Sequence, residues 1–161
     1  MNRSFTLRCF SCRHQYGFTL WVSSLYPQEY KTCIKDIRTG KYGTEWQELF
    51  LKERSFAVDA RETLYLCHNC RDWDIQPSLA AYLPKSEGKP VFSEKGAKPS
   101  GPVEFVSPEQ LREMYLYKSY PHPCKRCGSR MKRANTEHLL FLTCPRCGAE
   151  NEVLTVIDWG E

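Results

Sequence analysis

The sequence lacks the long apolar run that a membrane-spanning helix needs, which is roughly 18 consecutive residues. Its first residues, MNRSFTLRC, also lack the apolar stretch of a secretory signal peptide. These absences predict a soluble, cytoplasmic protein that enters no membrane. Hydrophobic residues nevertheless make up 41% of the 161 residues and aromatic residues 13%, so a folded chain is expected.

The common signatures of catalytic sites are also missing, since no G-x-x-x-x-G-K-[ST], G-x-S-x-G or H-E-x-x-H occurs. Asp72 and Asp74 alternate along an expected strand and share a face, but surface carboxylates without a pocket do not indicate catalysis. The four histidines are scattered. His122 either supports or replaces a nearby cysteine ligand or lies at the surface. We therefore expect a protein that is not an enzyme.

Cysteine, by contrast, is abundant. Eight of the nine cysteines form four C-x-x-C pairs, and without an export signal this spacing is typical of metal binding rather than of disulfides. The ninth, Cys33, shares one helical face with Tyr30, Ile34 and Ile37, and Gly40 is expected to end that helix. Cys33 is therefore predicted to be a small apolar core residue.

The two C-terminal pairs, CKRC (124–127) and CPRC (144–147), are separated by sixteen residues. A hairpin of that length would bring the two turns together into a tetrahedral four-thiolate site. Gly128 and Gly148 follow the two pairs, and glycine tolerates the left-handed backbone of such turns. Residues 119–158 thus resemble a zinc ribbon. The C-x-x-C-G pattern also resembles rubredoxin, so iron is the alternative metal, because ligand type does not separate the two.

The apparent completeness of that motif leaves CFSC (9–12) and CHNC (67–70) to pair with each other. Spacing alone also permits 67–70 to pair with 124–127. Arg13 and Arg71 stand where the other two turns have glycine, and two half-sites joined across a dimer are the alternative for the first site. We predict two sites, Cys9, Cys12, Cys67 and Cys70 in the first and Cys124, Cys127, Cys144 and Cys147 in the second.

The pattern as a whole predicts a small α+β protein built from two antiparallel, four-cysteine, zinc-ribbon-like units. Residues 1–83 are expected to form the first unit, with strands at 16–22 and 62–67 and a two-helix insertion between them. Residues 84–102 are expected to be a linker or long loop, because ten of the nineteen are Pro, Gly or Ser. Residues 103–161 are expected to form the second unit.

That second unit is expected to begin with a short helix. Ser107 is its predicted N-cap, and Gln110 completes a capping box. The segments HLLFLTC (138–144) and EVLTVIDW (152–159) are predicted to be the strands of the C-terminal ribbon.

Charge gives little support to non-specific nucleic-acid binding. The formal net charge is +4, but eight thiolates and two Zn²⁺ ions together remove four positive charges. A local basic patch remains, which either contacts phosphates or balances the thiolate charge: Lys125, Arg126, Arg130, Lys132 and Arg133. Tyr16, Phe18 and Trp21 are candidates either for base stacking or for the core.

The whole chain resembles small bacterial proteins with two zinc ribbons, and this resemblance implies eight cysteine ligands, two structural zinc ions and no particular partner. We predict a non-catalytic zinc-binding protein whose sites support a surface for an unknown protein partner, as in an adaptor. Nucleic-acid binding through the basic loop 125–133 is the first alternative. A rubredoxin-like iron protein with a redox function is the second.

Overall fold

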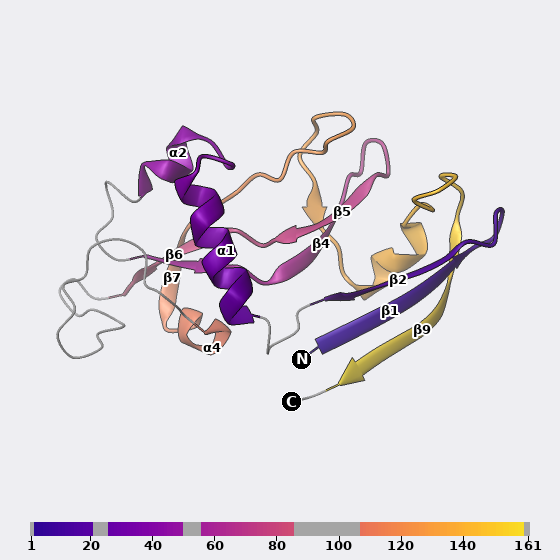
Figure 1. The fold of residues 1–161 in the computed structure, drawn as a ribbon, viewed down its shortest axis with the longest axis horizontal. Helices are drawn as coiled ribbons and strands as arrows, with labels where there is room; N and C mark the ends of the chain where they lie inside the picture. Colours follow the sequence, from indigo (N-terminus) through magenta and orange to yellow (C-terminus); the bar gives the residue numbers. More distant parts are fainter. Residues whose placement is uncertain (1, 21–25, 50–55, 86–106, 160–161) are drawn as a thin grey trace. The chain divides into compact units, whose positions relative to one another are not determined.

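The computed structural model describes residues 2–20, 26–49, 56–85 and 107–159 (Figure 1). Three small, mostly antiparallel sheets and few helices make up these residues, as expected for a small α+β protein. None of the helices described is long and apolar enough to cross a membrane. The chain divides into two compact units, unit 1 from Met1–Ser24, Glu62–Gln76 and Pro121–Glu161, and unit 2 from Leu25–Arg61 and Pro77–Tyr120.

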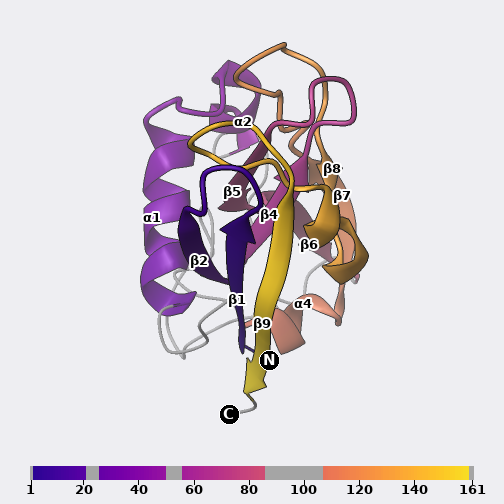
Figure 2. The same cartoon turned by 90° about the vertical axis from the view of Figure 1, so that its right-hand side faces the viewer.

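Unit 1 contains two of the sheets. In the first, β1 (Asn2–Cys9) lies between β2 (Gln15–Leu20) and β9 (Asn151–Trp159), as Figures 1 and 2 show. In the second, β4 (Glu62–Leu66) lies between β5 (Trp73–Pro77) and β8 (Lys132–Arg133). β1 runs antiparallel to both of its neighbours, and β4 runs antiparallel to β8.

One apolar core joins these two sheets. Leucines from both sheets are buried in it together with Phe5, and Tyr16, Phe18, Trp73 and Val153 pack around them. Tyr16 and Phe18 therefore contribute to the core, while Trp21 lies outside the described residues. The buried members of this core are Phe5, Leu7, Leu64, Leu66, Leu139 and Leu142.

The predicted strand at 138–144 is wrong. Thr136–Phe141 form a 3₁₀ helix, η2, which Asn135 caps by accepting hydrogen bonds from the backbone N–H groups of Glu137 and His138. Because Leu139 of this helix and Leu142 directly after it are buried in the core, the segment serves as a packing element and not as one arm of a hairpin.

Unit 2 is built from the two segments that interrupt unit 1. The first supplies α1 (Tyr26–Arg38), α2 (Thr44–Gln47) and β3 (Ala57–Asp59). The second supplies β6 (Ala80–Pro84), α4 (Pro108–Leu111) and β7 (Met114–Ser119). β6 is the central strand of the sheet β3-β6-β7 and runs antiparallel to both neighbours.

This division differs from the predicted one, which placed a boundary at 84–102. The predicted helical insertion of the first unit packs with β6, β7 and α4 instead of belonging to one metal site. Most of the predicted linker, residues 86–102, lies outside the described residues. The capping box of Ser107 and Gln110 is confirmed at the start of α4.

The helical face predicted around Cys33 is confirmed for Tyr30, Cys33 and Ile37, while Ile34 is half-buried. Tyr26, Tyr30, Cys33 and Ile37 of α1 are buried in unit 2. Burial raises the pKa of the Cys33 thiol to about 12, so the thiol stays protonated at neutral pH. Cys33 is thus an unreactive core residue, as expected for a thiol in apolar surroundings.

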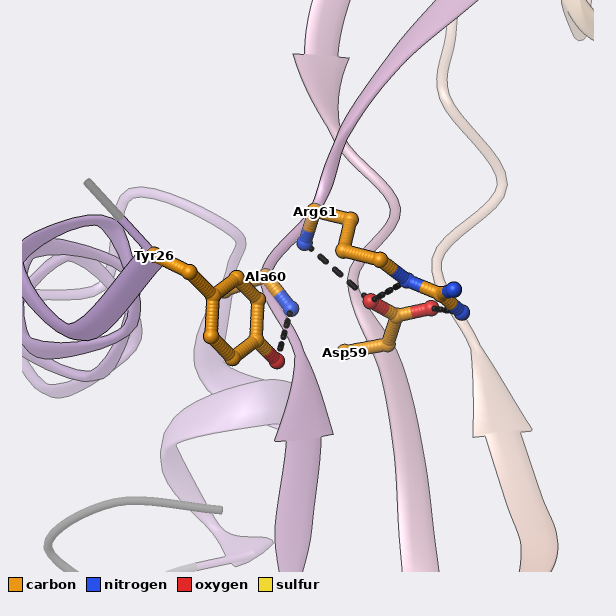
Figure 3. A network of polar contacts seen from close by, with 4 residues as sticks. All are labelled: Tyr26, Asp59, Ala60 and Arg61. Carbon is orange, nitrogen blue, oxygen red and sulfur yellow. Dashed lines mark hydrogen bonds and ion pairs between the residues drawn. The ribbon is translucent and has the colours of Figure 1, made fainter. Parts of the chain in front are cut away.

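Asp59, the last residue of β3, forms an ion pair with Arg61 (Figure 3). The Asp59 side chain is 2% exposed, and its two carboxylate oxygens accept hydrogen bonds from Arg61 Nε at 2.9 Å and from an Arg61 terminal nitrogen at 2.7 Å. The Arg61 backbone N–H donates to the same carboxylate at 3.1 Å. Beside this pair, the Ala60 N–H donates to the Tyr26 hydroxyl of α1 at 3.5 Å. The chain between β3 and β4 is thereby tied to the helix.

Candidate metal centres

The eight C-x-x-C cysteines gather into two groups, both within unit 1. In each group the four sulfur atoms lie within 4.8 Å of one another. We call them site A, formed by Cys9, Cys12, Cys144 and Cys147, and site B, formed by Cys67, Cys70, Cys124 and Cys127. The predicted sets are therefore wrong, because the first C-x-x-C turn pairs with the fourth and the second pairs with the third.

The sulfur positions fit a tetrahedral metal ion. Four thiolates at about 2.3 Å from a central Zn²⁺ lie about 3.8 Å from one another, whereas a disulfide requires about 2.05 Å. In site A the Sγ–Sγ distances are 3.4 Å for Cys9–Cys147 and 3.8 Å for Cys12–Cys144. In site B they are 3.5 Å for Cys67–Cys127 and 3.6 Å for Cys70–Cys124.

Each site closes with ligands from one chain. The alternative in which the first site forms from two half-sites across a dimer is therefore wrong. A metal ion at site A would join the two ends of unit 1, since its ligands come from residues 9–12 and 144–147. A metal ion at site B would join residues 67–70 to residues 124–127. Both of these turns lie, in the sequence, between the two turns of site A.

The four cysteine turns share one backbone conformation. We number them 1 to 4 in chain order, from Cys9, Cys67, Cys124 and Cys144. In turn 1 the Cys9 N–H donates to the His14 carbonyl at 2.9 Å, and the Arg13 N–H donates to the Cys9 carbonyl at 3.1 Å. The same two hydrogen bonds occur in the turns that begin at Cys67, Cys124 and Cys144. The residue after the second cysteine has a positive φ in all four turns: Arg13 (59°), Arg71 (62°), Gly128 (74°) and Gly148 (77°).

Each site combines one arginine turn with one glycine turn. The arginine turn connects two strands, β1 to β2 in site A and β4 to β5 in site B. The glycine turn leads into a strand that pairs antiparallel with the first of these, β9 with β1 and β8 with β4. A bridge flanks each glycine turn at the same place, Pro123 with Arg130 and Thr143 with Glu150. The two sites are thus two copies of one arrangement, and the residue after each C-x-x-C distinguishes the two turns of a site.

The predicted C-terminal hairpin fails because its two halves have other partners. Lys132 and Arg133 of β8 pair with Leu66 and Tyr65 of β4, so the segment after turn 3 joins the sheet of site B. The Ala134 N–H extends this pairing by donating to the Leu64 carbonyl at 2.8 Å. Sixteen residues would suffice for a hairpin, but here they carry the chain from one site to the other.

Hydrogen bonds adjust the thiols for metal binding. The Cys12 N–H donates to Cys9 Sγ and is the main reason why the pKa of Cys9 falls to about 6. Hydrogen bonds from the Asn69 side chain and then from Ser129 lower the pKa of Cys127 to about 5. Each site therefore has a thiol that is already ionised at neutral pH, and metal binding displaces the protons that remain on the others.

Polar contacts also connect the surroundings of the two sites. Trp73, three residues after Cys70, donates from Nε1 to the carbonyl of Thr143 at 2.8 Å, directly before Cys144. The Thr143 hydroxyl in turn donates to the Arg71 carbonyl at 3.4 Å. These contacts join turn 2 of site B to turn 4 of site A.

His122 is not among the ligands. Its ring is buried and stacks on Tyr65 at 3.9 Å between ring centroids, and Nδ1 lies 3.0 Å from the Gln76 side-chain oxygen. The Met131 N–H donates to the His122 carbonyl, which brings the chain on either side of turn 3 together. His122 is therefore a packing residue beside site B, not the surface residue that the sequence also allowed.

The predicted carboxylate pair has structural partners. Lys125 Nζ lies 2.7 Å from the Asp74 carboxylate, and the Gln76 amide donates to Asp74 at 2.9 Å. Burial opposes ionisation of Asp74, but the hydrogen bonds from Lys125 and Gln76 prevail and lower its pKa. Asp72 approaches Cys124, with 4.0 Å between a carboxylate oxygen and Sγ. Both carboxylates thus have contacts within unit 1.

The other members of the predicted basic patch are exposed. Arg126, Arg130, Lys132 and Arg133 have solvent-accessible side chains, and no carboxylate within the described parts of the chain forms an ion pair with them. Lys125 alone is held by an acidic partner, Asp74. As far as the described residues go, these four cations are thus available to contact an anion.

Replacing Gly128 with alanine is expected to lower the free energy of unfolding of the metal-loaded protein by about 1 kcal/mol, because its φ of +74° is unfavourable for any residue with a Cβ. An added Cβ would meet no atom within 4 Å, so no clash adds to this effect. Urea unfolding measures the change. Arg71→Gly is the matched control and should act in the opposite direction, and equal stability of both variants with the parent would contradict the left-handed turns.

No protein-family model matches this chain, and comparison with curated proteins and with solved structures finds no similar protein. Its function is therefore inferred from the geometry of its own residues.

Proposed function

We propose that this is a non-catalytic zinc protein in which two zinc-ribbon-like sites stabilise unit 1 as a surface for a partner protein. The supporting observation is the closed set of four thiols at each site. A catalytic zinc ion usually has three protein ligands and keeps a fourth position for water or substrate. With four cysteines around each ion, no position remains for chemistry, and the ions act on the fold alone.

Zinc binding of this kind is large enough to control folding. Structural zinc sites contribute roughly 10–16 kcal/mol in small modules, against a net stability of about 5–15 kcal/mol for a typical domain. Within the described residues, the apolar clusters of unit 1 are small, and one of them includes the site B ligands Cys67 and Cys124, so its fold should depend on the ions.

The proposal is tested on the full chain purified after growth with zinc. Elemental analysis is expected to find two zinc ions per chain, and the protein to be colourless, whereas an iron–thiolate protein absorbs visible light. The loaded chain is then used to capture partners from a lysate treated with nuclease, with a Cys67→Ser variant as the matched control. A captured protein that rebinds the loaded chain after purification, and not the variant, supports an adaptor role.

Nucleic-acid binding is the second candidate, and the exposed cations of β8 and turn 3 favour it. It predicts that partners are captured from an untreated lysate and not from the nuclease-treated one. It also predicts that RNA affinity falls steeply with salt and that the slope decreases when Lys132 and Arg133 are replaced with alanine. Weak, salt-independent binding would remove this candidate. Fewer than two metal ions per chain would overturn both.

A further inference from the structure

β9 is an edge strand with an unusual surface. Its nine residues pair with β1 at every position except Leu154, and no strand in the described part of the chain pairs with its other edge. Alternate N–H and C=O groups therefore point away from the sheet, as on any unpaired edge. Leu154, Val156 and Ile157 are 39%, 42% and 47% exposed, so apolar side chains also accompany this edge.

The metal site does not require a strand of this length. β8 holds the equivalent position in site B, where it pairs with β4 over only two residues. Those residues are Lys132 and Arg133, charged side chains of the type that protects sheet edges from association. β9 is more than four times as long and contains neither lysine, arginine nor proline.

The acidic residues of β9 do not protect its edge either. Glu152 is ion-paired with Arg8, and Asp158 with Arg3, both on β1. Their charges are thus offset by the neighbouring strand. Between them lies the uncharged segment Val153–Ile157, VLTVI, whose β-branched residues favour strand pairing.

We propose that β9 binds β9 of a second copy of this chain, in an antiparallel pair whose two-fold axis passes through Val156. The register supports this choice of axis. Val156 lies opposite the buried Phe5 and so points to the core side of its sheet, while Thr155 and Ile157, opposite Thr6 and Ser4, point to the other side. An axis at Val156 places Val156 beside its own copy, and Thr155 beside the partner subunit's Ile157, with matching faces.

Other axes fit less well. The irregularity between Thr6 and Leu7 leaves Leu154 without a partner on β1 and shifts the alternation of faces beyond it. An axis at Thr155 would place Glu152 opposite the partner subunit's Asp158, two like charges on mismatched faces. An axis at Val156 keeps Glu152 and Asp158 apart, and it joins two three-stranded sheets into one sheet of six strands. A pairing of about five residues is small for an interface, so the dimer should be weak.

The zinc-loaded full chain is examined by sedimentation over a wide concentration range, with hydrogen exchange measured at both ends of that range. The expected result is a rise in mass from one chain to two, with amides of residues 154–158 exchanging more slowly in the dimer. Val156→Lys is expected to abolish dimerisation, because it places two lysines side by side at the axis. Phe141→Lys, which changes a similarly exposed apolar residue of η2, is the control and should still dimerise.

The parent chain alone can overturn the proposal, whether or not the variants fold. A mass of one chain at every concentration would do so, and so would a dimer in which the amides of residues 154–158 show no added protection. Equal loss of dimer in both variants would indicate general hydrophobic association and not pairing of β9. Two zinc ions per chain in each variant verify that its fold is intact.

Discussion

Replacing Cys67 and Cys127 together with serine is expected to remove one metal ion per chain, whereas replacing Cys12 and Cys67 together is expected to remove both. The first pair lies within site B, and the second pair takes one ligand from each site. A four-thiolate site that loses a ligand loses most of its affinity, and further loss within the same site changes the stoichiometry no more. Elemental analysis of the purified variants counts the ions.

The two double variants have opposite outcomes under the pairing that the sequence suggested. With Cys9, Cys12, Cys67 and Cys70 in one site, Cys12→Ser with Cys67→Ser would cost one ion, and Cys67→Ser with Cys127→Ser would cost two. Cys33→Ala is the matched control, because Cys33 is buried in unit 2 and should leave both ions bound. Loss of an ion from this control would mean that the fold, and not a ligand, had been affected.

The sequence was sufficient to predict the cysteine turns and insufficient to pair them. The hydrogen bonds of a C-x-x-C turn are local, so four similar segments predict four similar turns. Pairing depends on which strands meet, and β8 meets β4 across more than sixty residues of sequence. The shorter spacing between Cys127 and Cys144 was misleading, because the buried Leu139 and Leu142 keep those residues from forming a hairpin.

One local signal separates the four turns into two kinds. Arg13 and Arg71 were interpreted as departures from a glycine pattern, yet they adopt the same left-handed backbone as Gly128 and Gly148. An arginine in that conformation costs about 1–2 kcal/mol, so its occurrence in both N-terminal turns distinguishes one half of each site from the other. Matching an arginine turn with a glycine turn, in nested order, gives the structure's two sites.

In unit 2, too, local structure could be predicted from the sequence and strand pairing could not. The buried face of α1 was predictable, because Tyr30, Cys33 and Ile37 recur at helical spacing. The sheet β3-β6-β7 was not, because its strands come from two segments separated by β4, turn 2 and β5. Short strands such as Ala57–Asp59 have too few residues for a pattern, and only their pairing with β6 defines them.

Replacing Asp59 with alanine is expected to lower the free energy of unfolding of unit 2 by about 3 kcal/mol, because removal of one partner leaves the charge of Arg61 in a largely buried position. The Arg61 side chain is 29% exposed, so solvent offsets part of the effect and places it at the low end for a buried pair. The variant also removes an acceptor for the Arg61 backbone N–H at the end of β3. Urea unfolding followed by tryptophan fluorescence measures the change, since Trp46 is buried in unit 2.

Asp158→Ala is the matched control for this experiment. It removes the carboxylate of another arginine–aspartate pair, Arg3–Asp158, in which both side chains are more than a third exposed. Exposed ion pairs contribute about 1 kcal/mol or less, so this variant should unfold close to the parent. Asp59→Ala should keep two metal ions per chain, because both sites lie in unit 1. A loss of stability no larger than that of the control would mean that Asp59 and Arg61 are hydrated, and a loss of metal would mean that the two units do not fold separately.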